Sequence, residues 1–82
     1  MKNEKLKLHI IKHVELKKLY IEGNEDHIDI TAIGNIFNGI SNIKRQQLIY
    51  KPITKYILEK KIHAITIHTF TEQEWKNKKN KF

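Results

Sequence analysis

The stretch IHAITIHTFTEQEW (Ile62–Trp75) carries the clearest secondary-structure pattern in the chain. Residues 62–70 have the alternation of a β-strand, with even-numbered positions on one face and odd-numbered positions on the other. Apolar side chains occur on both faces, which favours a central strand that is covered on at least one side. Thr71 to Glu74 then form a capping box, which predicts a helix that starts after Thr71 and is anchored by Trp75.

The rest of the chain predicts short elements on either side of this stretch. The expected order is a helix over 4–14, strands over 18–22 and 27–33, helices over 41–50 and 52–61, the strand over 62–70 and a last helix. We therefore expect an α+β fold, α-β-β-α-α-β-α, with a three-stranded sheet and helices packed on one face. Residues 1–82 are expected to form a single domain, in which residues 76–82 are a frayed basic tail.

The composition excludes several classes of protein. The 82 residues include no cysteine, so disulfides, thiolate catalysis and an iron–sulfur or zinc site built on the chain's own sulfur are excluded. No apolar run is long enough to cross a membrane, and the charged N-terminus does not resemble a signal peptide. No nucleophile lies beside a base in the sequence, so we expect a protein that is not an enzyme, located in a reducing cytoplasm.

The net charge of +7 allows two interpretations. Lys44, Arg45, Lys51 and Lys55 lie on two short helices that meet at a Lys-Pro junction, which resembles a helix-turn-helix and favours DNA binding. The alternative is an ordinary solvated surface, since 15 of the 16 basic residues are Lys and arginine is the residue that reads guanine. The second interpretation is favoured, and the first stays open.

The five histidines are the only plausible reactive groups in the chain. His9 and His13 have the four-residue spacing of a metal clamp on a helix, but without a third ligand they are expected to face solvent. His68 is expected to be structural. His27, at the end of the hairpin loop, and His63, at the start of the third strand, are better placed, because such edges can be held by the fold and still be accessible.

Two segments resemble the BolA family: FNGISNIKRQQLIY (Phe37–Tyr50) and IHAITIHTFTEQEW. Within that family, the KRQQ at Lys44–Gln47 is similar to the IbaG (YrbA) branch. The resemblance extends over nearly the whole chain, and it implies a BolA-like fold, similar to a type II KH domain.

The resemblance also implies a function. Members of this family are non-enzymatic partners of monothiol glutaredoxins, and the pair holds a bridging [2Fe–2S] cluster, with roles in iron–sulfur cluster trafficking, iron sensing or stress response. The glutaredoxin and glutathione supply sulfur, and the BolA-like chain supplies nitrogen. The family's histidine in the IHA block matches His63, and His27, directly after the short GNED loop, is the candidate second ligand. No cluster is expected in the isolated chain, and a homodimer is possible. The alternative implied by the family is a KH-like transcription regulator that binds DNA.

Overall fold

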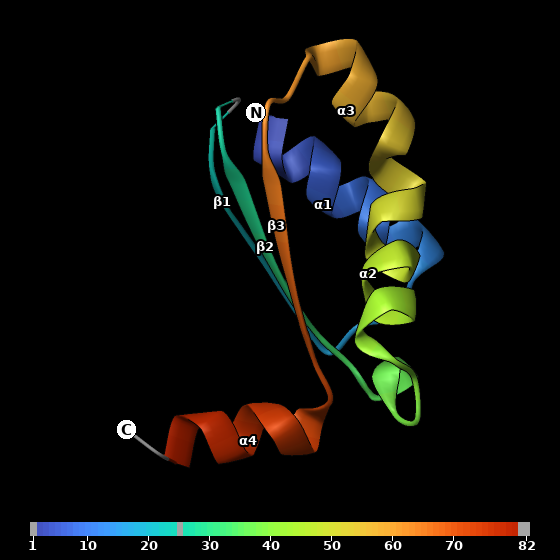
Figure 1. Ribbon diagram of the computed structural model, residues 1–82, viewed down its shortest axis with the longest axis vertical. Coiled ribbons are helices and arrows are strands. Elements are labelled where there is room, and N and C mark those ends of the chain that lie inside the picture. Colours follow the sequence, from blue (N-terminus) through green and yellow to red (C-terminus); the bar gives the residue numbers. More distant parts are fainter. Residues whose placement is uncertain (1, 25, 81–82) are drawn as a thin grey trace.

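In the part of the chain that the structure describes, the fold consists of a three-stranded sheet and four α-helices (Figure 1). The computed structural model describes residues 2–24 and 26–80. In chain order the elements are α1 (Lys2–His13), β1 (Lys18–Gly23), β2 (Ile28–Ile33), the 3-10 turn η1 (Asn35–Phe37), α2 (Asn42–Tyr50), the 3-10 turn η2 (Lys51–Ile53), α3 (Thr54–Lys60), β3 (Ile65–Phe70) and α4 (Glu72–Asn80). The predicted α+β class and element order are confirmed.

The strands lie in the order β1-β2-β3, with β1 antiparallel and β3 parallel to β2. Leu19 pairs with Ala32 across the first pair, and Ile30 pairs with Ile67 across the second. The prediction that residues 62–70 form the central strand was therefore wrong, because β2 is central and β3, which starts at Ile65, is an edge strand. A parallel connection requires a crossover, which here is formed by α2, η2 and α3.

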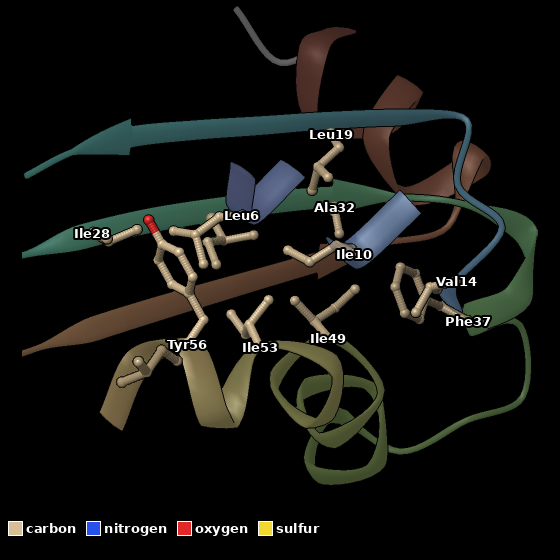
Figure 2. Close-up of a cluster of buried hydrophobic side chains, with 12 residues drawn as sticks. Leu6, Ile10, Val14, Leu19, Ile28, Ala32, Phe37, Ile49, Ile53 and Tyr56 are labelled. Atoms are coloured by element: carbon tan, nitrogen blue, oxygen red, sulfur yellow. The ribbon is translucent and has the colours of Figure 1, made fainter. Parts of the chain in front are cut away.

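The core lies between one face of the sheet and the helices α1, α2 and α3 (Figure 2). Leu6 and Ile10, four apart on α1, and Ile49 and Ile53 in the crossover are fully buried against that face. Strand β2 contributes Ile30, which is also fully buried. Among the described residues, no helix combines the length and the apolar character needed to cross a bilayer.

Helix α4 differs from the expectation that all helices pack on one face. It lies at one end of the sheet and extends away from α2 (Figure 1). The ring of Trp75 packs 5.3 Å from that of Phe70 and 6.2 Å from that of Tyr20, on the sheet face opposite the other three helices. Since α4 covers part of this second face, Phe70 is partly buried there, which explains why β3 carries apolar side chains on both faces.

The predicted start of α4 is confirmed, but its predicted end was wrong. The Thr71 N–H donates to the Glu74 carboxylate (2.8 Å), and the Glu74 N–H donates to the Thr71 hydroxyl (3.1 Å), as in a capping box. The helix continues to Asn80, so residues 76–80 are helical rather than a frayed tail. Residues 81–82 of that expected tail lie outside the described part of the chain.

The crossover helices do not form a helix-turn-helix. Ser41 caps α2 as predicted, accepting a bond from the Lys44 N–H (3.4 Å). Pro52 then lies in the first turn of η2, where its missing N–H costs nothing, so the chain stays helical into α3. The two helices consequently run end to end (Figure 1), whereas a helix-turn-helix needs two helices that cross steeply.

Candidate functional site

The two candidate ligands, His27 and His63, lie at the same end of the sheet. At this end the β1–β2 turn and the connection from α3 to β3 meet (Figure 1). The Ile28 N–H donates to the Ala64 carbonyl (3.0 Å), which extends the parallel pairing by one step before β3 begins. Because His27 precedes Ile28 and His63 precedes Ala64, the pairing brings the two histidines into one region.

His63 lies on the α3–β3 connection, exposed, and not within the strand as predicted. Helix α3 ends with Lys61 in the left-handed conformation (φ 53°), where its N–H donates to the Leu58 carbonyl (3.3 Å). The Ile62 N–H donates to the Ile57 carbonyl (3.2 Å), which completes a Schellman motif. The side chain of Ile62 packs against the core. The backbone beside His63 is therefore held by α3, and its imidazole stays accessible.

His27 is positioned by a tight turn. Gly23 has φ 103°, and a Cβ at this position would clash with the His27 carbonyl, so the turn requires glycine. The Asn24 side chain accepts bonds from the N–H groups of Asp26 (2.9 Å) and His27 (3.4 Å). These contacts fix the backbone of His27 immediately before β2.

The imidazole of His27 has two partners on the open face of the sheet. Its Nε2 lies 3.1 Å from a carboxylate oxygen of Asp29 and 3.0 Å from the hydroxyl of Thr66. The His27 side chain remains 52% exposed. A carboxylate on one imidazole nitrogen favours the proton there and leaves the lone pair on the other nitrogen for a metal.

Sequence reasoning did not find Asp29 and Thr66 as partners of His27. The alternation in residues 27–33 places His27 and Asp29 on one face, so half of this contact had a signal in the sequence. Thr66 comes close only because β2 and β3 pair in the register Asp29↔Thr66. That register has no signature in the sequence of either strand.

The remaining histidines do not join this region. His9 and His13 are exposed on α1, as expected, and His13 Nδ1 lies 2.8 Å from the His9 carbonyl. His68 is exposed on the open face of β3. In residues 2–24 and 26–80, no group of three or more His, Cys, Asp or Glu side chains is arranged to hold a metal. The described residues can thus offer one or two imidazole nitrogens, but not a complete ligand set.

Arg45 is not available for nucleic acid, which corrects its assignment as a candidate contact. The residue is buried (8% exposed), and its Nε donates to the Ile40 carbonyl (2.8 Å). Its two terminal nitrogens bond both oxygens of Glu74 on α4, at 2.8 and 3.3 Å. The guanidinium also lies 5.9 Å from the centre of the Phe37 ring. Arg45 joins α2 to α4.

The same contact sets the charge state of Glu74. The hydrogen bond from Arg45 lowers the pKa of Glu74, and the bond from the Thr71 N–H lowers it further. Partial burial acts in the opposite direction and is outweighed. Glu74 is therefore ionised at neutral pH and provides the counter-charge of Arg45.

Two of the three lysines of the proposed nucleic-acid surface share one groove, and the third has an acidic neighbour of its own. Lys44 and Lys51 line a groove between α1 and α2. Lys55 is 90% exposed and lies 3.9 Å from Glu59, one turn farther along α3. With Arg45 buried, the described residues do not include the four-residue basic surface that the sequence suggested.

Comparison with known proteins assigns the family. Residues 3–74 match the family model described as BolA-like protein. A Buchnera aphidicola protein, BU385, is 47% identical over 79 residues, which cover 96% of this chain and 99% of that protein. The acid stress protein IbaG of Escherichia coli is 32% identical over 75 residues, covering 92% and 89% of the two chains. The solved structure of BolA1 from Arabidopsis thaliana superimposes with a TM-score of 0.78 at 23% identity, over 90% of this chain and 95% of that one. The chain therefore belongs to the BolA-like family, in its IbaG branch.

Proposed function

We propose that this chain is a non-enzymatic partner of a monothiol glutaredoxin, to which it supplies a histidine ligand for a bridging [2Fe–2S] cluster. The observation that carries the proposal is the position of His63. Its imidazole is exposed, while Ile62 before it and Ile65 after it pack against the core. Such a side chain can enter a partner's site without any rearrangement of the fold.

The donor set fits a shared cluster and not one held by this chain alone. The chain has no cysteine, so the sulfur ligands have to come from the glutaredoxin and from glutathione. His27 is the candidate second ligand, because it lies at the same end of the sheet as His63 and Asp29 orients its ring. Histidine in place of thiolate raises the potential of such a cluster and makes its binding sensitive to pH.

Both properties suit a cluster that is transferred or sensed, as in iron–sulfur trafficking, iron sensing or stress response. We place the pair in the reducing cytoplasm, which is where a chain without cysteine and a glutathione-dependent partner are both expected.

The test is to reconstitute the cluster anaerobically on a mixture of this chain, a monothiol glutaredoxin and glutathione. Visible circular dichroism then reports the ligand environment of the cluster, and gel filtration reports the complex. We expect His63→Ala to change or abolish the spectrum. His68→Ala is the matched control, because it removes another exposed histidine, from β3, and should leave the spectrum unchanged.

The two parts of the proposal fail in different ways. If the unmodified chain forms no complex with the glutaredoxin, the proposed partner is wrong. If the complex forms and His63→Ala retains the original spectrum, the partner stands and the ligand assignment is wrong.

A further inference from the structure

An open groove of about 970 Å³ lies between the end of α1 and the start of the crossover helices. Its apolar residues are Val14, which follows α1, Ile40, which precedes α2, and Leu48 and Pro52 from the crossover. All four side chains are aliphatic. The groove is lined on one side by α1 and on the other by α2 and η2.

Basic and polar side chains surround this apolar surface. Lys44 on α2 and Lys51, which opens η2 directly after it, are seven residues or about two turns apart, and His13 ends α1 opposite them. Lys44, Gln47, Leu48 and Lys51 have the i, i+3, i+4, i+7 spacing of a single helix face, so α2 turns one continuous stripe toward the groove. The lining residues include no carboxylate.

We propose that this groove binds an acidic amphipathic helix of a partner protein. An aliphatic surface with cations at its edge is the arrangement that accepts a helix whose one face is apolar and whose flanks carry Asp or Glu. The groove lining includes no Phe, Tyr or Trp on which a base could stack, and the only arginine of the chain is turned toward Glu74. Nucleic acid is therefore the less suitable ligand.

A second copy of the chain is also poorly suited. Each of the four helices contains more basic than acidic residues, so none of them complements Lys44 and Lys51. The chain as a whole carries a net charge of +7, which disfavours self-association through a basic groove.

The groove is separate from the His63 region. Lys44 lies in the first turn of α2, whereas His63 follows the end of α3, at the other end of the crossover (Figure 1). A helix bound in the groove would leave His63 accessible. This inference does not depend on the proposed glutaredoxin function, and the two partners are expected to bind at the same time.

The test uses the full chain and two synthetic peptides of about 14 residues, a length at which a helix is marginal alone and can form on binding. In the first peptide, Glu and Leu are placed so that a helix has one acidic and one apolar face. In the second, each Leu is replaced by Ser, so the charge is unchanged. Binding is measured by fluorescence anisotropy, and the site is mapped from amide chemical shifts.

We expect the Glu/Leu peptide to saturate the chain and to shift the amides of Val14, Ile40 and Leu48, while the Glu/Ser peptide does not saturate. Lys44→Glu/Lys51→Glu should weaken binding about tenfold or more. The control Lys5→Glu/Lys76→Glu makes the same change in net charge at exposed positions outside the groove and should change binding less than about twofold.

Four results would overturn the inference. The first is an equal loss of binding in both double variants, which would indicate nonspecific charge attraction. The second is equal binding of the two peptides. The third is that the peptide shifts only amides on the open face of the sheet. The fourth is that duplex DNA, or self-association of the chain without peptide, shifts the groove amides instead.

Discussion

Replacement of Arg45 by alanine tests whether this residue is structural or belongs to a nucleic-acid surface. The variant loses the bond from Nε to the Ile40 carbonyl, worth about 1 kcal/mol. It also loses the pair with Glu74, which we count at only about 1 kcal/mol because that carboxylate is 46% exposed. Removal of two buried methylenes costs about 1.5 kcal/mol more. Alanine has no side-chain conformational entropy to lose on folding, whereas the ordering of Arg45 costs about 1.5–2 kcal/mol, so this difference offsets part of the loss.

The net expectation is a free energy of unfolding lower by about 2 kcal/mol, which is a large share of the stability of a chain this small. Urea unfolding followed by circular dichroism measures it. Lys44→Ala, at the neighbouring exposed position, is the matched control and should lie within about 0.5 kcal/mol of the unmodified chain. Arg45→Lys keeps the charge without the forked geometry and should fall between the two.

A cycle of Arg45→Ala, Glu74→Gln and the double variant isolates the contact between α2 and α4, with an expected coupling of about 1 kcal/mol. A structural role for Arg45 is refuted if the unfolding free energies of Arg45→Ala and Lys44→Ala agree within about 0.5 kcal/mol. In that case the buried Arg45 side chain contributes nothing to stability, and Arg45 would again be a candidate contact for nucleic acid.

Two further predictions concern Glu74 and the β1–β2 turn. Glu74→Gln should destabilise the chain by about 1 kcal/mol at pH 7. Folding lowers the pKa of Glu74 from its ordinary value of 4.5, so the stabilisation by the Glu74 carboxylate is fully present above pH 4.5 and is lost as the pH falls through the folded-state pKa. The unfolding free energies of the two proteins should therefore converge in acid. A constant difference down to pH 3 would contradict the assigned cause. Gly23→Ala should destabilise by about 2 kcal/mol or more, since it combines positive φ with a clash against the His27 carbonyl. Gly39→Ala, where φ is 72° and an added Cβ would meet no atom of the described residues within 4 Å, should cost only about 1 kcal/mol. Urea unfolding measures both variants, and equal losses of unfolding free energy would exclude the clash.

Local patterns in the sequence predicted most of the helices and strands. The features that they did not predict depend on contacts between segments that are distant in the sequence. Thr71 and Glu74 are three residues apart, so their mutual bonds could be read directly, and Ser41 was likewise identified as a cap. The alternation in β3 gave the correct faces from Ile65 to Phe70, but not the position of the strand in the sheet. Apolar residues on both faces indicate that a strand is covered on both faces, but not that it is central. Here α4 covers the second face of β3, although β3 is an edge strand.

The candidate site shows the same division. His63 was found through its motif and His27 through its place beside the loop, both of which are local. Arg45 was misassigned because Glu74 lies 29 residues away in sequence and nothing near Arg45 marks it as a partner. The groove is lined both by Val14, which follows α1, and by Leu48 on α2, so it too has no signal in either segment alone.

The parallel pairing of β2 with β3 also constrains the order in which the chain can fold. The β1–β2 hairpin needs only the short turn after Gly23, and hairpins of this kind form within microseconds. Strand β3 can join β2 only after the chain between them has been gathered into η1, α2, η2 and α3, and closure of so long a loop is slow. We therefore expect the turn that carries His27 to form before β3 brings both Thr66 and His63 to it. The two-histidine region is therefore complete only in molecules that have finished folding, and we expect a partner that needs both nitrogens to bind only those.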